Sequence, residues 1–491
     1  MNRLGTTSDV VSMSDVFAMT VVTFDAPGLG DRSYLITDGE VGVVIDAQRD
    51  PLDYLREAEK LDVEITHVLE THIHNDYVSG GLALSRATGA TYGIPAGEPV
   101  SFQHEARSLG GGDSLDAGRL EITAIETTGH TDHHLAYLVR LPDATDPHAE
   151  GDLVVCTGGS LLVSTTGRTD LLGLELAETL ARSQWRSVRR LLKTLPTGTR
   201  ILPTHGFGSF CSATPGGGDL TAIPTIADEL TQNPAALLDE DDFVATTLSS
   251  LPPIPAYYRR MAPLNRLGQK APSFEPVAML DSAGLEQAIS SDRWVVDLRG
   301  RRVFAAGHLP GTLNLELGQN LATYLGWLVP WDSELVLLAD GEAEIAEARR
   351  LLARIGRDEL YAGALWSTAG PTSREARGER GRATGSYEVA SFLDLARAAD
   401  GSGPDRLQVL DVRHPHEWQS GHLASARLLP LPELAARRHE VPPAGKIWLY
   451  CGAGYRSAVA ASLLSGWGAS PVLVDDAWEN ALSSGLAIEA D

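Results

Sequence analysis

An internal repeat constrains the fold of this chain more than any other feature of its sequence. The segment VVDLRGRRVFAAGHL, which starts at Val295, aligns without gaps on VLDVRHPHEWQSGHL, which starts at Val409. Each copy opens with a short apolar run typical of a buried strand, and a second apolar run followed by a helical pattern comes later. We therefore expect two α/β domains of one fold, at residues 277–370 and 386–491.

The rest of the chain divides by composition. At 491 residues the chain is too long for a single core. Residues 371–385, rich in Gly, Ser, Thr and charge, are predicted to be a linker. Residues 211–276 contain ATPGGGD and LPPIP and are predicted to be a loop-rich extension and linker, with one or two helices around IADELTQNPAALL. Residues 1–210 alternate strand-like and helical runs, which indicates one N-terminal domain.

Charge and cysteine content exclude several classes of protein. A formal net charge of -25 argues against binding to nucleic acid or to an anionic membrane, because phosphate contacts need an excess of Lys and Arg. Three cysteines, Cys156, Cys211 and Cys451, cannot form a disulfide framework in so long a chain. No apolar run is long enough to cross a membrane. We expect a cytoplasmic protein in which any of the three thiols is free to react.

Four signatures in the N-terminal domain follow strand-like runs. They are HIHND from His72, TTGHTDHH, VVCTGGSLL and PTHGFGS. Imidazoles held on short loops at strand ends suit a metal site, since metal ligands need fixed positions and neutral nitrogens. One such match is weak, but four in this order form a specific pattern.

The four signatures together resemble the metallo-β-lactamase superfamily, whose fold is a four-layered αββα sandwich with metals at one edge of the sheets. The resemblance implies a first metal held by His72, His74 and His130. It also implies a second metal held by Asp76, by the residue that follows Asp76, and by His205.

Two departures from that pattern argue against a second metal. Tyr77 follows Asp76 where the superfamily has a histidine, and Gly159 stands where it has a bridging aspartate. A two-metal hydrolase is therefore not expected. The resemblance then implies one metal ion in the N-terminal domain, with Fe(II) favoured and Zn(II) as the alternative. Asp76, His205 and Tyr77 are expected behind the ligands or holding a water, and a metal-free pocket of hydrogen-bonded histidines is the alternative.

The second copy of the repeat carries a further chemical signature, YCGAGYRSAVAASLL. Six residues from Cys451 to Arg456 form a loop that leads directly into a predicted helix. The backbone N–H groups of such a loop and the positive end of the helix lower the pKa of a thiol and stabilise an anionic substrate. A buried structural cysteine fits less well, because glycines and an arginine surround Cys451.

This copy resembles the rhodanese family, in which a cysteine accepts sulfane sulfur as a persulfide. The resemblance implies that Cys451 is the nucleophile and that Arg456 helps to hold an anionic donor. In the first copy Asp340 stands at the position of Cys451, so that copy is predicted to be inactive. The loop residues expected to cradle the persulfide are Gly452, Ala453, Gly454 and Tyr455.

The order of the domains resembles bacterial fusions of a persulfide dioxygenase with rhodanese domains. It implies that one Fe(II) oxidises a low-molecular-weight thiol persulfide to sulfite, while the rhodanese end exchanges sulfur with thiosulfate. Those enzymes usually bind iron through two histidines and an aspartate, at the positions of His72, His130 and Gly159. Because the carboxylate is missing, His74 would have to complete the site.

Two other functions remain open from the sequence. One is a Zn-dependent thioester hydrolase of the glyoxalase II type, and the other is a sulfurtransferase whose metallo-β-lactamase-like domain is catalytically dead. The expected partners are a small thiol persulfide and thiosulfate or sulfite, with no nucleic acid and no membrane. A homo-oligomer is compatible with each of these functions.

Overall fold

The computed structural model describes residues 19–26, 28–142, 152–206, 208–213, 223–291, 293–369, 384–401 and 407–490. The chain divides into two compact units, Met1–Pro272 with Ala353–Gly356, and Ser273–Leu352 with Arg357–Asp491. Residues 371–383 of the predicted linker and residues 214–222 of the predicted extension lie outside the described residues.

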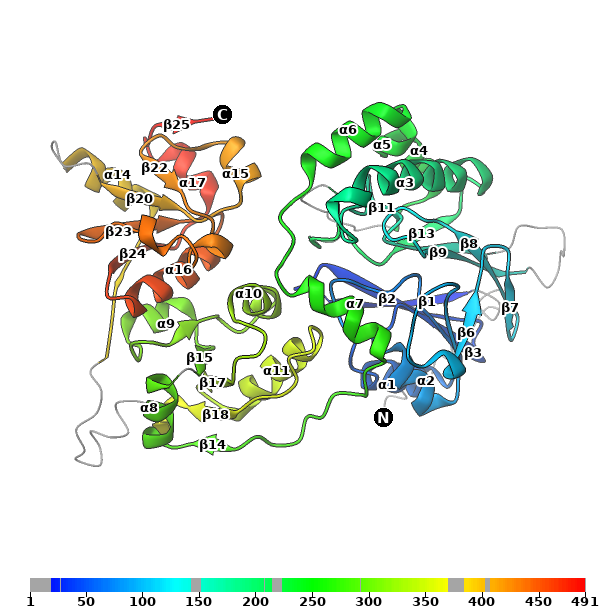
Figure 1. Cartoon of the computed structure of the whole chain (residues 1–491), viewed down its shortest axis with the longest axis horizontal. Coiled ribbons are helices and arrows are strands. Elements are labelled where there is room, and N and C mark those ends of the chain that lie inside the picture. The colour runs from blue at the N-terminus through cyan, green and yellow to red at the C-terminus, as the bar shows by residue number, and fades with distance from the viewer. Residues whose placement is uncertain are drawn as a thin grey trace, which may run out of the picture. The chain divides into compact units, whose positions relative to one another are not determined.

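The first unit contains two sheets that face each other (Figure 1). The first sheet has the order β1 (Thr20–Ala26), β2 (Asp31–Thr37), β3 (Val41–Ile45), β4 (Glu64–Leu69), β5 (Thr91–Pro95), β6 (Ala106–Leu109). The second has the order β13 (Arg200–Pro203), β10 (Asp152–Gly158), β9 (Leu135–Leu141), β8 (Leu120–Glu126), β7 (Ser114–Ala117). The strand-like runs that lead into the four signatures coincide with strands of these sheets, namely β4, β8, β10 and β13.

Apolar side chains of both sheets interlock to form the central core of this unit. Tyr34 and Val43 of the first sheet belong to the same buried cluster as Leu120 and Val154 of the second. The outer face of the first sheet packs with α1 (Leu52–Leu61) and α2 (Gly81–Thr88), and that of the second with α3 (Leu174–Thr194). Figure 1 shows these four layers, so the predicted αββα sandwich is confirmed.

The segment that follows contains the helices expected around IADELTQNPAALL and two more, so its described part has more helix than the sequence suggested. Thr225 and Asp228 form a reciprocal capping box, and the side chains of Asn233 and Asp239 cap the next two helices. These caps supply the hydrogen bonds that start helices in a polar sequence. The helices are α4 (Ile226–Gln232), α5 (Pro234–Leu237), α6 (Glu240–Ser250) and α7 (Tyr258–Leu267).

The second unit contains two five-stranded sheets with the same connectivity. The first has the order β14 (Met279–Leu280), β18 (Ala362–Leu365), β17 (Leu335–Ala339), β15 (Trp294–Asp297), β16 (Leu313–Asn314). The second has the order β19 (Glu388–Ala390), β24 (Ser470–Val474), β23 (Lys446–Tyr450), β20 (Gln408–Asp411), β22 (Ala426–Leu428). Every adjacent pair is parallel. The internal repeat is therefore a repeat of structure.

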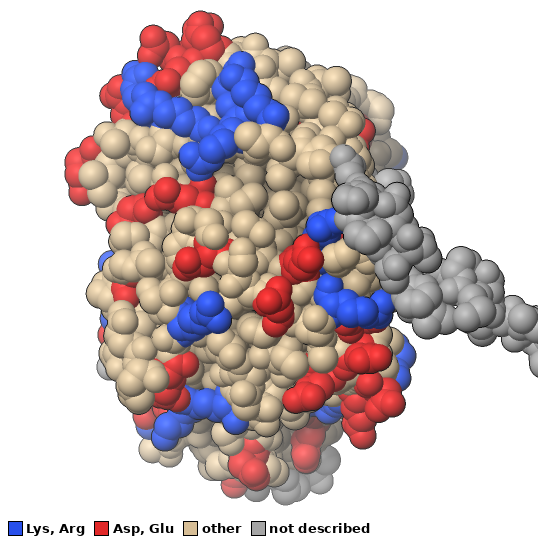
Figure 2. Space-filling view, turned by 90° about the vertical axis from the view of Figure 1, so that its right-hand side faces the viewer, with Lys and Arg blue, Asp and Glu red and all other residues tan. Residues whose placement is uncertain are grey.

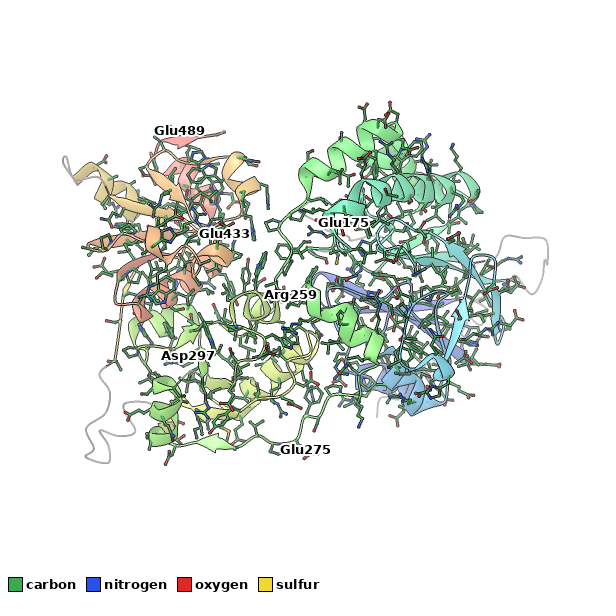
Figure 3. All side chains as sticks on the ribbon, viewed as in Figure 1. Glu175, Arg259, Glu275, Asp297, Glu433 and Glu489 are labelled. Atoms are coloured by element: carbon green, nitrogen blue, oxygen red, sulfur yellow. The ribbon has the colours of Figure 1, made fainter. Side chains whose placement is uncertain are left out.

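The repeated Asp-x-Arg motif forms one buried ion pair in each copy. Asp297, labelled in Figure 3, lies at the end of β15. It accepts a hydrogen bond of 2.7 Å from Arg299, which also donates to the carbonyl of Gly307. The Arg299 guanidinium lies 3.4 Å from the ring centroid of Trp366. The second copy repeats this arrangement with Asp411, Arg413, Gly421 and Trp478. The pair closes the loop after the strand in both copies.

The surface agrees with the acidic composition. Figure 2 shows one face of the molecule, on which acidic and basic side chains are interspersed. Basic side chains gather near the top of that view. Among the described residues, the structure contains no helix with the length and hydropathy needed to span a bilayer.

Candidate metal centre and thiol site

The histidines of the first unit follow strands that end at one edge of the sandwich. His72 and His74 come directly after β4, His130 lies between β8 and β9, and His205 comes directly after β13. All four side chains are at most 1% exposed. Buried imidazoles on short loops have few alternative positions, so their hydrogen bonds determine which nitrogen is free.

His72 presents its Nε2 to the interior of the cluster. Its Nδ1 lies 2.9 Å from the hydroxyl of Thr71, which in turn donates to the Asp46 carboxylate at 2.8 Å. Because the hydroxyl proton points to Asp46, the hydroxyl accepts from Nδ1–H of His72, and Nε2 keeps its lone pair. Burial and neighbouring imidazoles hold the pKa of His72 well below its ordinary value, so the ring is neutral.

His130 is fixed in the same manner by a backbone group. Its Nδ1 donates to the carbonyl of Arg168 at 2.8 Å, and its buried Nε2 has no hydrogen-bond partner among the described residues. A Cβ atom at Gly159 would lie 2.2 Å from this ring, and one at Gly167 would lie 2.6 Å from it. Two glycines thus form the slot that holds His130, and an aspartate at position 159 has no room.

His74 is held through Nε2, whereas His72 and His130 are held through Nδ1. Its Nε2 lies 3.2 Å from the Glu70 carboxylate, 3.3 Å from that of Asp46, and 3.0 Å from the hydroxyl of Tyr77. Its Nδ1 is buried and has no hydrogen-bond partner in the described part of the chain. Burial alone would lower the pKa of His74, but Asp46 and Glu70 raise it to about 9. Tyr77 therefore orients His74.

His205 is bound to two carboxylates behind it. Its Nδ1 lies 2.8 Å from Asp31 and 3.1 Å from Asp76, and its Nε2 lies 3.4 Å from Nε2 of His72. Burial alone would lower the pKa of His205, but Asp76 and Asp31 raise it to about 10. Burial and the charge of Asp76 raise the pKa of Asp31 to about 7. Asp76 is thus paired with His205.

The structure brings together most of the predicted residues in overlapping groups. In each group every residue offers a ligand atom within 4.8 Å of the others. The predicted set of His72, His74 and His130 is divided between two of these groups, and His205 is common to both. The groups are His72 with His74 and His205; His130 with His205 and Cys211; Asp31 with Asp76 and His205; and Asp46 with Glu70 and His74.

Four residues of this cluster did not emerge from the sequence, namely Asp31, Asp46, Glu70 and Cys211. Asp46 ends the apolar run VGVVID, and its φ of 56° marks a constrained position. Cys211 follows His205 in the segment HGFGSFC. The sequence did contain one signal for Asp46, because an acidic residue directly after an apolar strand-like run often belongs to a site at the end of that strand.

The donor set fits a metal ion. Nδ1 of His74 and Nε2 of His130 are buried nitrogens without hydrogen-bond partners among the described residues, and each ring is oriented by a bond from its other nitrogen. This arrangement is typical of metal-binding histidines. The residues that would hold the ion are His72, His74, His130 and His205.

Replacing His72 or His130 with Ala is expected to remove the bound metal, because each contributes an oriented imidazole. Gly159→Asp is expected to lower metal content as well, since the new side chain displaces His130 from its slot. Metal content measured by elemental analysis tests both. His104→Ala is the control, since that side chain is 80% exposed, and unchanged metal in His72→Ala and His130→Ala would contradict the assignment.

In the second unit Cys451 lies between a strand and a helix. β23 ends at Tyr450, and α16 (Tyr455–Gly466) begins four residues after Cys451. Cys451 is 2% exposed, and its Sγ lies 3.5 Å from the hydroxyl of Ser457. Gly454 caps the helix with a φ of 86°, which favours glycine. In the first copy Asp340 follows β17 at the equivalent position and places a carboxylate there.

The predicted free charge at Arg456 is paired. Its guanidinium donates two hydrogen bonds to the carboxylate of Glu417, and its side chain is 14% exposed. A Cβ atom at Gly452 would lie 3.3 Å from this guanidinium. Arg456 therefore lies against the loop and connects it to α15 (Pro415–Gln419).

The first copy contacts the Cys451 loop through two arginines at the start of α9 (Arg301–Ala306). Arg301 donates to Asp475 at 2.6 Å and lies 3.5 Å from the carbonyl of Ala453, and Arg302 also donates to Asp475. A Cβ atom at Gly454 would lie 2.1 Å from the same carboxylate. Asp475 thus connects the two arginines of the first copy to the Cys451 loop of the second.

Glu417→Gln is expected to destabilise the protein near neutral pH, and to do so by a smaller amount in acid. Burial alone would raise the pKa of Glu417, but hydrogen bonds from Arg456 outweigh it and lower the pKa from 4.5 to about 2. The lowered pKa corresponds to about 3 kcal/mol of stability, present above pH 4.5 and lost as the pH falls toward 2. Denaturant unfolding at pH 7 and pH 3.5 measures it.

The control for this pH effect is Glu433→Gln. Glu433, labelled in Figure 3, pairs with Arg437 at the surface, and its side chain is 48% exposed. Such exposed pairs contribute little to stability. An equal loss of stability for Glu417→Gln at both pH values would contradict the role of the Arg456 pair.

Two families match this chain. The Metallo-beta-lactamase superfamily matches residues 27–205, and the Rhodanese-like domain family matches residues 394–483. A hydroxyacylglutathione hydrolase of Rhodospirillum rubrum is 30% identical over 240 residues, which cover 48% of this chain and 76% of that enzyme. The chain belongs to the metallo-beta-lactamase superfamily. It also contains a rhodanese-like domain.

Other comparisons agree with this assignment. A probable metallo-hydrolase of Burkholderia pseudomallei is 29% identical over 46% of this chain and 84% of its own length. A hydroxyacylglutathione hydrolase of Hyphomonas neptunium is 32% identical, but the chain spans only 64% of its length. The crystal structure of a metallo-beta-lactamase from Staphylococcus aureus subsp. aureus COL matches with a TM-score of 0.62 and 25% identity, covering 71% of this chain and 99% of that one.

Proposed function

We propose that this chain is an enzyme of sulfane-sulfur metabolism. Its second rhodanese-like domain transfers sulfur through Cys451, and its N-terminal domain uses one metal ion to oxidise a low-molecular-weight persulfide. The observation that carries the proposal is the position of Cys451, a buried thiol at the end of β23 and the start of α16. Loop N–H groups and the positive helix end there stabilise a thiolate and the persulfide formed from it.

The transfer reaction proceeds in two displacements. The Cys451 thiolate attacks the outer sulfur of thiosulfate, and a new S–S bond forms while the old one breaks. Sulfite leaves with the electron pair of the broken bond, and Cys451 carries an anionic persulfide. A thiophile such as cyanide then attacks the outer sulfur of that persulfide, which yields thiocyanate and regenerates the thiolate. Arg456 and Glu417 hold the loop in place during both steps.

The N-terminal domain would act on the persulfide of a small thiol. In the overall reaction a persulfide, dioxygen and water give a thiol, sulfite and two protons. A bound metal would supply a site where sulfur and oxygen meet, and Fe(II) is favoured because the oxidation requires a redox-active ion. His72 and His130 are neutral nitrogen donors, while Tyr77, Asp46 and Glu70 orient His74.

Thioester hydrolysis is the second candidate function. It is favoured by the hydroxyacylglutathione hydrolases among the relatives. Against it stand Tyr77 and Gly159, since hydrolysis in two-metal enzymes uses a water between the ions. Zinc in place of iron would support this function. A protein without any metal would support a sulfurtransferase with an inactive N-terminal domain.

Cys451→Ser is expected to reduce sulfur transfer from thiosulfate to cyanide to background, because a hydroxyl ionises far less readily than a thiol and does not form a persulfide. Arg456→Ala is expected to weaken transfer partially, since the loop loses its connection to Glu417. The assay is the formation of thiocyanate.

Asp340→Ala is the matched control, because it alters the same loop in the copy that has no thiol. It is expected to transfer sulfur at nearly the wild-type rate. Cys451→Ser protein that still forms thiocyanate at the wild-type rate would overturn the assignment of the nucleophile.

Protein loaded with Fe(II) is expected to consume dioxygen when given a small-molecule persulfide, and sulfite should appear in equal amount. An oxygen electrode and a sulfite assay measure the two, with Cys451→Ser protein used to keep sulfur transfer from consuming the product. Hydrolysis of a lactoyl thioester without oxygen uptake would instead establish the hydrolase. The absence of both activities, with transfer intact, would indicate an inactive domain.

A further inference from the structure

Cys211 belongs to the histidine cluster, yet the proposed reaction gives it no role. It offers its Sγ within 4.8 Å of ligand atoms of His130 and His205, and all three side chains are fully buried. The thiol is free of any disulfide. A soft donor in such a group is a potential metal ligand.

The backbone of one residue fixes both Cys211 and His130. The N–H of Arg168 donates to the carbonyl of Cys211 at 2.8 Å, and the carbonyl of Arg168 accepts from Nδ1 of His130 at 2.8 Å. A short antiparallel contact between Gly167 and Ser212 holds the two segments together. The thiol and the imidazole are therefore positioned as a unit.

The other observation that points to a ligand is the free nitrogen of His130. Its Nε2 is fully buried and has no hydrogen-bond partner among the described residues. A buried nitrogen without a partner is costly unless something binds it. Gly159 brings no side chain to this nitrogen, so Cys211 is the member of the group of His130, His205 and Cys211 that becomes anionic on losing a proton.

The alternative is that Cys211 simply fills space, as many buried cysteines do. Cys156 has such a space-filling role, because it lies in the apolar cluster between the two sheets. Cys211 belongs to none of the apolar clusters described above. The Cys211 thiol instead lies near ligand atoms of His130 and His205.

We infer that Cys211 supplies a thiolate ligand to the metal held by His130 and His205, in place of the carboxylate missing at Gly159. This inference rests on the proposed function only in assuming that the N-terminal domain binds a metal. The metal–sulfur bond forms as the thiol proton leaves for solvent. The expected occupant is a divalent ion of intermediate softness, such as Fe(II), Zn(II) or Co(II).

Cobalt substitution tests the inference in the full-length protein. A cobalt–thiolate bond gives an intense charge-transfer absorption in the near ultraviolet, whereas imidazole and carboxylate ligands do not. Wild-type protein loaded with Co(II) is expected to show this band, and so are Cys156→Ala and Cys451→Ser. Cys211→Ser is expected to lose the band and to bind Co(II) roughly tenfold more weakly in equilibrium dialysis.

The outcomes distinguish the hypothesis that Cys211 is a ligand from the hypothesis that the domain binds a metal. Wild-type protein that binds no Co(II) would overturn both the metal centre and the role of Cys211. Wild-type protein that binds Co(II) without the band, or a band that persists in Cys211→Ser and Cys211→Ala, would overturn the role of Cys211 and leave the metal centre standing. The Ala variant guards against a folding defect specific to Ser, and circular dichroism checks both variants.

Discussion

The buried carboxylate of Asp46 orients two of the clustered histidines, His72 through Thr71 and His74 directly. It accepts hydrogen bonds from the backbone N–H and the hydroxyl of Thr71 at 2.7 and 2.8 Å, and from the hydroxyl of Thr204. Thr71 follows β4 of the first sheet, and Thr204 follows β13 of the second. Burial alone would raise the pKa of Asp46, but the nearby His74 and these donors hold it below its ordinary value. One charge thus ties the edges of both sheets to the imidazoles between them.

The loss of two superfamily ligands has a structural counterpart in this cluster. At position 159 the space is taken by the ring of His130 rather than left open, and at position 77 a phenol donates to the backbone carbonyl of Asp46 and accepts from His74. Asp76 pairs with His205 at 3.1 Å. Asp76 therefore lies on the Nδ1 side of His205, and Nε2 of His205 faces His72.

The sequence predicted the architecture well because that architecture follows local patterns. Apolar strand runs, the repeat from Val295 and Val409, and the loop after Cys451 all report contacts near in sequence. The groups around the histidines were harder to predict, because Asp31 and Cys211 reach His205 only once both sheets are assembled. The helices α6 and α7 were not expected from the sequence, although Asp239 is a typical N-cap residue. The pairing of Arg456 with Glu417 also depended on tertiary structure.

The contact of Arg301 and Arg302 with Asp475 bears on how this chain can be divided. A fragment beginning near residue 386 would contain the whole rhodanese-like fold with its nucleophile, yet it would lack both arginines. Asp475, whose side chain is 4% exposed, would then be left without its two cationic partners beside Gly454. A buried charge stripped of its partner is strongly destabilising. The copy without a thiol therefore supplies both cationic partners of the carboxylate that lies beside the nucleophile's loop.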